Sequence, residues 1–472
     1  MNKQDELFLA ELYKDRAELA DALEKPAARG IKNSVVEKYS DQAHFIYELL
    51  QNADDAHASN AKFILEKDRL IFSHDGNRYF SVTDPKREDA DTKAGVIGDI
   101  NSITSIANSN KTQTQASIGK FGVGFKAVFQ YTNTPHIYDP GFKFKIDRFI
   151  VPSLLESDFP ERKPNETLFV FPFDHQERSP EEAYNDISNK LKNLSYPLLF
   201  LSRLENIEFL IEGFEGFYGK KICNKFDSNG IMAECLKLAQ FDGSENHDDT
   251  LWLFSRIDEK NYKYSVGFFL DQDGKLTPVN KPAFCFFPTK ETTGLKFIIH
   301  APFLLTDSRE GIRAGIPHNE RMVNLLADLA ADSIVLLKKI GEKQAPRLID
   351  DNIINIIPYK LDDFSSPENK DRISFQPFYY KIFNTFKENS IIPSTDGYTK
   401  KENAYWAAVP QLPQLFSNKQ LTQLSENPNA KWVFTSIGRD ELQRNNKDLT
   451  IYIDSLIRTN VNEEAIISGR NK

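Results

Sequence analysis

A short stretch of the chain, IYELLQNADDA, spaces three polar residues so that they could form a site. Glu48, Asn52 and Asp55 follow one another at intervals of four and three residues. On a helix this spacing places them along one stripe, while Leu49 and Leu50 face a core. An exposed polar face is the alternative interpretation, but asparagine is a poor helix former and Asn-Ala-Asp-Asp is unusual on a surface. The pattern indicates a candidate site carried by a helix.

A second stretch, SIGKFGVGFKAVF, has the composition of a phosphate-binding loop. Gly119, Gly122 and Gly124 precede an apolar run that predicts a helix. Glycines at such a place let backbone amides approach phosphates, and the helix dipole favours the anion. The P-loop pattern fails because Phe125 follows Gly124. The dinucleotide-binding form fits residues 122–127 but requires a buried strand before it, where QTQASIGK is polar. A plain glycine-rich turn is the alternative to a phosphate loop.

Taken together, the motifs resemble a known superfamily. ELLQNADDA, the pair Asp75-Gly76 and GKFGVGF are similar, in this order, to the three sequence boxes of the GHKL ATPases. This superfamily includes the ninety-kilodalton heat-shock chaperones, MutL, type II topoisomerases and sensor kinases. IYELLQNADDA, IGKFGVGFKAVF and APFLLTDSREGIR resemble the sacsin-type branch more narrowly, and SIANSNK at 105–111 is similar to the lid segment of the chaperones. The resemblance covers roughly residues 30–345.

The resemblance implies ATP and Mg²⁺ as ligands and gives each matching position a role. Glu48 would be the general base that deprotonates the attacking water, and Asn52 would ligate the metal through its side-chain oxygen. Asp55 would support the base pocket or the ribose, and Thr167 the water network beside adenine. The other expected nucleotide contacts are the lid residues Ser109 and Lys111 and the loop residues Gly119, Lys120 (with Lys126 as an alternative cation), Phe121, Gly122, Val123, Gly124 and Phe125.

The adenine box departs from the family form, which is Asp-x-Gly-x-Gly. Here the chain reads His74-Asp75-Gly76-Asn77-Arg78, so that aligning Gly76 with the first family glycine places His74 on the aspartate. Because a carboxylate is the best acceptor for the adenine amino group, we predict Asp75 with a small register shift and keep His74 as the alternative. The second glycine is absent, which leaves the identity of the base open.

An arginine further along the chain is the second candidate catalytic residue. LLTDSREGIR places Ser308-Arg309-Glu310 between an apolar strand and a polar loop. A surface arginine paired with Glu310 is one interpretation. The stretch also resembles the Ser-Arg-Glu turn of the chaperone middle domain, whose arginine reaches the γ-phosphate. In that role Arg309 would neutralise charge that develops on the transferred group, with Arg313 as the reserve.

The functional prediction is a slow, Mg²⁺-dependent ATPase whose nucleotide-driven closure remodels a partner or an attached domain. Glu48 favours hydrolysis over phosphotransfer, since sensor kinases have another residue at that position. The alternative is a nucleotide-dependent switch or scaffold without significant turnover, which the altered adenine box favours. The resemblance further implies chaperone-like activity, defence against phage in bacterial members, and a homodimer formed on nucleotide binding. The sequence does not identify the protein client.

Composition and charge limit the classes of partner that the chain is expected to bind. A net charge of −9 over 472 residues argues against a nucleic-acid clamp and against DNA repair of the MutL kind. Cys223, Cys235 and Cys285 lack metal-ligand spacing, which favours free thiols in a reducing compartment. The N-terminus has no apolar core of a signal peptide, and no stretch approaches the roughly 20 apolar residues of a membrane helix. We expect a cytoplasmic protein that binds neither membranes nor nucleic acid.

These residues need helices and strands to position them. The patterns predict helices over 3–24, 35–58, 321–340 and from Ser179, strands at 63–65 and 70–72, a polar loop over 84–115, and sheets of antiparallel appearance. With the resemblance, the predicted fold class is α/β: a Bergerat-type α/β sandwich at 1–175 as GHKL-type nucleotide-binding domain, an α/β transducer-like middle domain at 176–345, and a small mixed C-terminal region of unknown role at 346–472.

Overall fold

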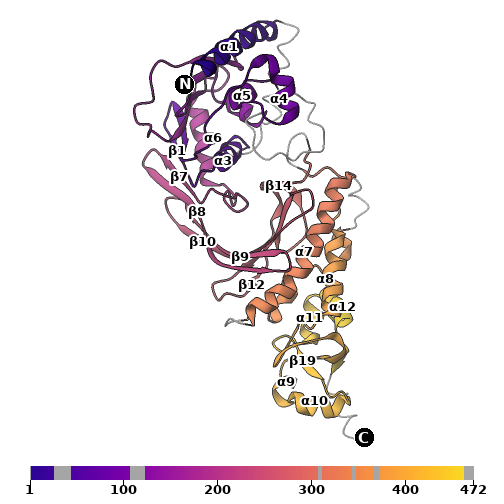
Figure 1. Cartoon of the computed structure of the whole chain (residues 1–472). Helices are drawn as coiled ribbons and strands as arrows, with labels where there is room; N and C mark the ends of the chain where they lie inside the picture. The colour runs from indigo at the N-terminus through magenta and orange to yellow at the C-terminus, as the bar shows by residue number, and fades with distance from the viewer. Residues whose placement is uncertain are drawn as a thin grey trace. The chain divides into compact units, whose positions relative to one another are not determined.

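A computed structural model describes residues 2–25, 44–106, 123–306, 311–342, 347–364 and 372–461 (Figure 1). The described chain forms two compact units of mixed α/β structure. The first takes residues up to 221 together with 238–248, and the second takes 222–237, 249–306 and the residues from 311 onward. Strands β8 (Phe214–Ser228), β9 (Ile231–Phe241) and β10 (Asn246–Ile257) carry residues of both units. The three-domain division stays a prediction.

The sheet of the first unit is mixed rather than antiparallel throughout. Its strand order is β7-β1-β2-β6-β3-β4-β5, and β1 pairs in parallel with β7 while the other neighbours are antiparallel. This parallel pair corrects the expectation from the sequence, which cannot show that strands so far apart in the chain become neighbours. The strands are β1 (Asn60–Leu65), β2 (Arg69–His74), β3 (His136–Tyr138), β4 (Lys143–Asp147), β5 (Val151–Leu154), β6 (Thr167–Pro172) and β7 (Asn206–Ile211).

The helices predicted for this unit are confirmed where the structure describes them. The N-terminal helix is α1, and the described part of the predicted helix 35–58 is α3. Ser179 caps the next predicted helix in a reciprocal capping box with Glu182, as P-E-E after a serine indicates. The predicted polar loop contains short helices. The helices are α1 (Lys3–Leu23), α3 (His44–Asp55), α4 (Glu88–Ala94), α5 (Asp99–Ile103), α6 (Pro180–Lys192), and the 3₁₀ helices η1 (Pro85–Arg87) and η2 (Val123–Gln130).

Aromatic side chains fill the core of the first unit. Phe72 of β2 lies with its ring centroid 4.6 Å from that of Phe63 and 5.8 Å from that of Phe169 on β6. Phe125 of η2 packs 6.2 Å from both Phe169 and Phe171. All five rings are buried, and each contributes roughly 1.5–3 kcal/mol by leaving water. The same cluster attaches η2, and with it the end of the glycine loop, to the sheet.

The second unit packs a long helix on a strand layer. Its strands follow the order β14-β13-β15-β11-β10, with β12 added on β11. Helix α7 (Pro317–Gly341) packs on β11 and buries one apolar face, which confirms the helix predicted at 321–340 and starts it four residues earlier, at a proline. The strands are β11 (Lys263–Leu270), β12 (Leu276–Thr277), β13 (Pro282–Cys285), β14 (Phe287–Thr292) and β15 (Ile298–His300).

The C-terminal part of this unit holds a second sheet of order β17-β16-β19-β18-β20, in which β18 is parallel to β19 and β20. From residue 347 onward the described chain has five α-helices and three short 3₁₀ helices. Buried Trp406 and Trp432 donate to the carbonyls of Ile437 and Phe416 at 2.8 and 2.7 Å. The elements are η3 (Asp351–Asn355), η4 (Leu361–Phe364), α8 (Gln376–Glu388), β16 (Ile392–Ser394), β17 (Gly397–Thr399), η6 (Lys401–Asn403), β18 (Ala404–Ala407), α9 (Leu412–Leu415), α10 (Asn418–Ser425), β19 (Lys431–Val433), α11 (Arg439–Asn445), α12 (Lys447–Leu456) and β20 (Thr459–Val461).

Among the described residues, no helix is both long and apolar enough to cross a membrane.

A buried asparagine clamps the chain around residues 304–313. Asn319 on α7 is 0% exposed and accepts a hydrogen bond from the Leu304 amide at 2.8 Å. Its side-chain amide donates to the carbonyls of Leu304 and Arg313, both at 2.8 Å. A backbone bond of 3.1 Å from Arg313 to Leu304 closes the same structure. One side chain therefore joins both arms of the segment that contains residues 307–310.

Replacing this asparagine tests the clamp. We expect Asn319→Ala to lower the free energy of unfolding of the second unit by roughly 2–4 kcal/mol, because the Leu304 amide and the Arg313 carbonyl lose this partner and the Leu304 carbonyl loses one of its two donors. Asn324→Ala is the matched control, since Asn324 on the same helix is exposed and donates only to the Glu320 carbonyl. Scanning calorimetry of both variants measures the effect. Equal melting temperatures for the two variants would contradict the clamp.

Candidate functional site

The predicted polar stripe lies on α3. Glu48 is half-buried, Asn52 is 6% exposed, and Asp55 ends the helix. Leu49 and Leu50 are buried in the core, as their helical positions indicate. A side-chain amide buried beside two carboxylates can be retained only if it has polar partners, because burying an unpaired amide costs free energy. This arrangement is typical of a site rather than of a solvated helix face.

The helix and the glycine loop meet at Gly124. This residue begins η2 together with Val123, and η2 packs against α3. A β-carbon at Gly124 would overlap the carboxylate group of Glu48. The third glycine of the motif therefore leaves the space that the Glu48 carboxylate occupies, and a larger residue there would push this side chain aside. Two segments that the sequence analysis joined only by resemblance are therefore in contact.

Several predicted residues lie outside the described residues. They are the lid residues Ser109 and Lys111, the loop residues Gly119, Lys120, Phe121 and Gly122, and Arg309.

The two adjacent aspartates at the end of α3 have different surroundings. The Asp54 carboxylate accepts backbone N–H groups from Ser202, Arg203 and Leu204 at 3.0, 2.6 and 2.8 Å. It ties the end of α3 to the segment that leads into β7. One oxygen of Asp55, Oδ2, is buried and has no hydrogen-bond partner among the described residues. Burial, followed by repulsion from Asp54, raises the pKa of Asp55 to about 7, although Arg78 acts in the opposite direction.

A small pocket lies at the end of β2, with Ala56, the residue that follows α3, in its lining. Within β2 and β6, His74 pairs directly with Thr167, and both side chains are buried. The Thr167 hydroxyl donates to Asp139 Oδ2 at 3.1 Å, which fixes the direction of its proton. The "His74 pocket", as we name it, is lined by Ala56, His74, Arg78, Tyr79, Phe80, Asp99 and Thr167.

The ring of His74 is held in one tautomer. Its side chain is 3% exposed, and the Gly76 amide donates to Nδ1 at 3.2 Å. Burial lowers the pKa of His74 to about 4, although the charge of Asp75 opposes this shift. A β-carbon at Gly76 would lie 2.6 Å from the Ala56 carbonyl and 2.9 Å from Nδ1, so the glycine is required. His74 is therefore a neutral imidazole with its proton on Nε2.

Asp75, which the sequence analysis favoured over His74 for the adenine contact, does not line the His74 pocket. Its Oδ1 accepts the amides of Ser59 and Asn60 at 2.8 and 2.9 Å, and its Oδ2 accepts the Asn60 side chain at 2.6 Å. Burial raises the pKa of Asp75, but these hydrogen bonds outweigh it and hold the pKa below its usual range. The carboxylate thus caps the start of β1, and the side chain next to it faces the pocket.

Asp99 and Arg78, which the sequence analysis did not select as site residues, close the pocket. Arg78 Nη2 donates to Asp99 Oδ1 at 2.6 Å, and Asp99 Oδ2 accepts the Ser81 amide at 3.2 Å and hydroxyl at 2.8 Å. Arg78 occupies the position where the second family glycine is absent. The missing glycine was the only feature of the sequence that pointed to Arg78. No feature pointed to Asp99, because this residue lies in a polar run without a motif.

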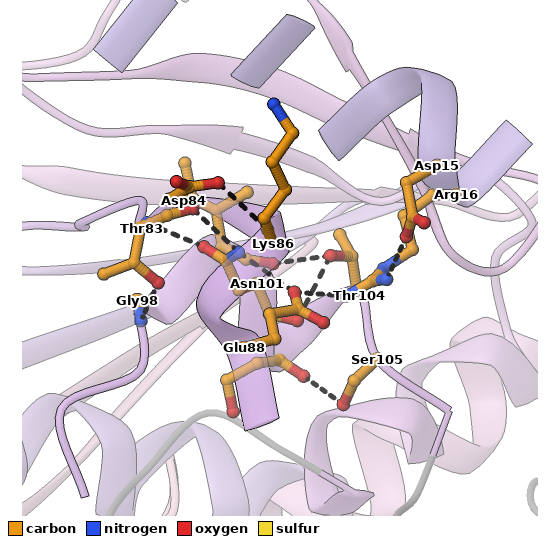
Figure 2. A network of polar contacts seen from close by, with 12 residues as sticks. Asp15, Arg16, Thr83, Asp84, Lys86, Glu88, Gly98, Asn101, Thr104 and Ser105 are labelled. Carbon is orange, nitrogen blue, oxygen red and sulfur yellow. Dashed lines mark hydrogen bonds and ion pairs between the residues drawn. The ribbon is translucent and has the colours of Figure 1, made fainter. Parts of the chain in front are cut away.

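A polar network holds the segment 83–105 in place (Figure 2). Asn101 of α5 accepts the Thr83 amide at 2.9 Å and donates to the Thr83 carbonyl and to Glu88 Oε1, each at 3.0 Å. Arg16 of α1 donates to the same Glu88 oxygen at 2.5 Å, and the Gly98 amide donates to the Thr83 hydroxyl at 3.1 Å. The network joins α1, α4 and α5, and so supports the helix that carries Asp99.

Lys126 and Phe125 point into the protein interior. The Lys126 ammonium donates to the Phe149 carbonyl at 2.8 Å and lies 4.6 Å from the centroid of the Phe149 ring. Burial, with a smaller effect from Arg16, lowers the pKa of Lys126 to about 7. Lys126, the alternative phosphate cation in the sequence analysis, is thus occupied elsewhere. The Phe125 side chain belongs to the aromatic core, which leaves only its backbone for a ligand.

Part of the chain is similar in sequence to a known protein family. Residues 24–146, which include the α3 stripe, Gly76 and Gly124, match the family model described as Sacsin domain. The chain is 28% identical over 333 residues to Protein NO VEIN of Arabidopsis thaliana, covering 63% of this chain and 11% of that protein. It is 21% identical over 499 residues to Sacsin of Homo sapiens, covering 79% of this chain and 10% of that protein. The chain spans about a tenth of the length of these curated relatives.

The contrast between Asp54 and Asp55 gives a pH-dependent prediction. Since the folded-state pKa of Asp55 lies above the unfolded value, the folded protein binds this proton more tightly, and stability falls as pH rises from about 4 to about 7. We expect Asp55→Asn to stabilise the first unit by about 1–3 kcal/mol at pH 8 and by little at pH 4. Thermal unfolding at both pH values measures the change.

Asp54→Asn is the matched control for this prediction. It removes charge from the neighbouring residue but weakens three hydrogen bonds to backbone amides, so we expect it to destabilise the protein at pH 8. An Asp55→Asn protein that melts at or below the wild-type temperature at pH 8 would contradict the assignment of a costly buried charge.

Proposed function

We propose that this chain is a Mg²⁺-dependent nucleoside triphosphatase with a GHKL-type nucleotide site in its first unit, arranged as a Bergerat fold. The observation that carries the proposal is the contact of Gly124 with the carboxylate of Glu48. It brings the carboxylate of the helix motif to the end of the glycine motif, where a terminal phosphate would be held. The Sacsin-domain match over 24–146 supports the proposal because it spans both motifs.

In the proposed reaction, Glu48 acts as general base. A water proton passes to the Glu48 carboxylate, the water oxygen bonds to the terminal phosphorus, and the bond from that phosphorus to the nucleoside diphosphate breaks. The half-buried position of Glu48 suits this role, because a carboxylate shielded from bulk water is a better base. Amides of the glycine loop would hold the phosphates, and Arg309 would neutralise charge on the transferred group.

Asn52 is the proposed protein ligand of Mg²⁺. Its side chain is buried one helical turn from Glu48. No cluster of three or more His, Cys, Asp or Glu residues that could hold a metal ion exists within the described part of the chain. Mg²⁺ commonly takes one or two protein ligands and completes its shell with phosphates and water, so a single amide fits this chemistry. When bound, the metal would neutralise phosphate charge.

The bound nucleotide would then determine which conformation of the chain a partner binds. On this basis we propose a chaperone-like remodelling role, a part in bacterial defence and a nucleotide-induced homodimer. The similarity to Sacsin, of which this chain matches a tenth, supports the first of these, and the other two rest on the resemblance of the sequence motifs alone.

The general-base assignment predicts a separation of binding from turnover. We expect Glu48→Gln to lower single-turnover phosphate release by roughly 10²-fold or more while nucleotide binding persists, since only the proton acceptor is lost. Arg309→Ala should also lower release. Glu66→Gln is the control and should not change the rate, since Glu66 is a half-buried residue that pairs with Arg69 in the β1–β2 turn. If the wild-type protein binds nucleotide but shows no turnover, the result would instead support the alternative function, a nucleotide-dependent switch without hydrolysis.

The contact at Gly124 predicts that even a methyl group at this position lowers turnover. We expect Gly124→Ala to lower turnover by about 10²-fold, because the new methyl displaces the Glu48 carboxylate. Gly141→Ala is the control, since a β-carbon there meets no atom closer than 3.4 Å. Circular dichroism checks that both variants fold. A fully active Gly124→Ala protein would show that Glu48 and the glycine loop do not work together.

A further inference from the structure

Lys126 is a buried lysine that the proposed reaction does not use. It lies two residues after Gly124 on η2 and is 1% exposed, a position that an apolar residue would ordinarily fill. Among the described residues, its ammonium has one hydrogen-bond acceptor, the Phe149 carbonyl at 2.8 Å. Burying an amine whose other N–H groups lack acceptors is costly. Such exceptions to good packing are expected where a residue serves a site.

Helix η2 itself has an unusual form. It runs as a 3₁₀ helix over the eight residues Val123–Gln130, although such helices rarely exceed three or four residues. Its far end is held, because the hydroxyl of the next residue, Tyr131, donates to Asp186 at 2.7 Å. Relaxation to an α-helix would shorten η2 by roughly 4 Å, since the rise per residue falls from about 2.0 to about 1.5 Å. A change of that size would carry Gly124 away from the Glu48 carboxylate.

Lys126 and Phe129 stabilise the present form of η2 by meeting the same residue. They lie three residues apart, which is the repeat of a 3₁₀ helix. Lys126 Nζ lies 4.6 Å from the centroid of the Phe149 ring and 5.4 Å from that of Phe129, and the two ring centroids are 4.8 Å apart. The ring contacts have little directional preference, whereas the hydrogen bond from Lys126 to the Phe149 carbonyl does. This bond therefore limits how far η2 can slide or rotate.

The carbonyl that accepts this bond belongs to a turn with a defined position. Arg148 and Phe149 lie between β4 and β5 with φ of 50° and 77°, in the left-handed region that bulky residues rarely adopt. Such a backbone persists only where its surroundings determine it. Arg148 donates to Asp21 at 2.5 Å and to Glu24 at 2.8 Å, which joins the turn to the end of α1. Lys126 thus attaches η2 to a turn that a separate helix holds.

Resting on the proposed nucleotide site, we infer that Lys126 is a positioning residue for hydrolysis, which holds η2 on the β4–β5 turn and so keeps the glycine loop at the distance from Glu48 that the reaction needs. In this role Lys126 touches neither the nucleotide nor the attacking water. Its loss should slow the chemical step more than it weakens binding, because a misplacement of about 1 Å can cost roughly 10²-fold in rate.

Replacement of Lys126 by methionine in the full chain tests this inference. Methionine keeps most of the side-chain volume but cannot donate. With ATP and Mg²⁺, we expect Lys126→Met to lower kcat for phosphate release by about tenfold and to change KM by less than about threefold. The melting temperature should stay at or above that of the wild type, because a costly buried amine is removed. A residue that serves only stability would lower kcat and the melting temperature together.

Two further variants keep the test decisive. Lys143→Met is the matched control, since Lys143 begins the same hairpin but pairs with Asp158 at 3.1 Å, and it should leave kcat unchanged. Arg148→Asn decides the matter if Lys126→Met does not fold. It removes the bonds from the turn to α1, and asparagine tolerates the left-handed backbone, so we expect a folded protein with kcat lowered about threefold.

The inference and the proposed function fail in different ways. Wild-type kcat in folded Lys126→Met, or a fall of kcat together with the melting temperature, would overturn the inference alone. If Lys126→Met does not fold, wild-type kcat in Arg148→Asn would do the same. Folded wild-type protein that releases no phosphate from ATP would overturn the proposed function, and the inference with it.

Discussion

The site depends on the space that Gly124 leaves for the carboxylate of Glu48. Because Gly124 has no side chain, the carboxylate lies directly against the start of η2, and any side chain there would move it. Two attachments hold the pair in this position. Asp54 fixes the end of α3 to the segment before β7, and Phe125 fixes η2 to the aromatic core on β6. The chemistry of the stripe is thus supported by residues that never face a ligand.

The same dense packing explains why neighbours in sequence have unlike roles. Asp54 and Asp55 point about 100° apart on a helix, so one meets backbone amides and the other faces away from them. His74 and Asp75 lie at the end of a strand, where successive side chains alternate between faces. Burial gives the ring a neutral state, whereas three donors keep the adjacent carboxylate ionised. Local geometry, more than residue type, decides which group a ligand would meet.

Local patterns in the sequence predicted the helices α1, α3, α6 and α7, because periodicity and caps are properties of short segments. They did not predict the parallel pairing of β1 with β7 or of β18 with its neighbours, since such pairs join distant segments. The polar stripe on α3 was predictable. Which of His74 and Asp75 lines the pocket depends on the face of the strand and on the hydrogen bonds of Asp75, which acceptor chemistry does not reveal. Alternation from the buried Phe72 would have favoured His74, which shares its face.

The network around Glu88 has a consequence for how this sequence can change over time. Arg16 is 5% exposed, and it shares a Glu88 oxygen with Asn101 from another helix. A substitution of Arg16 leaves Glu88 without its cation, and a substitution of Glu88 leaves Arg16 with Asp15 as its remaining carboxylate, whereas a joint replacement of Arg16 and Glu88 by apolar residues removes both charges. The effect on fitness of substituting any one of Arg16, Glu88 and Asn101 therefore depends on which residues occupy the other two positions. Related chains should keep this trio together or lose it together, a case of epistasis set by burial.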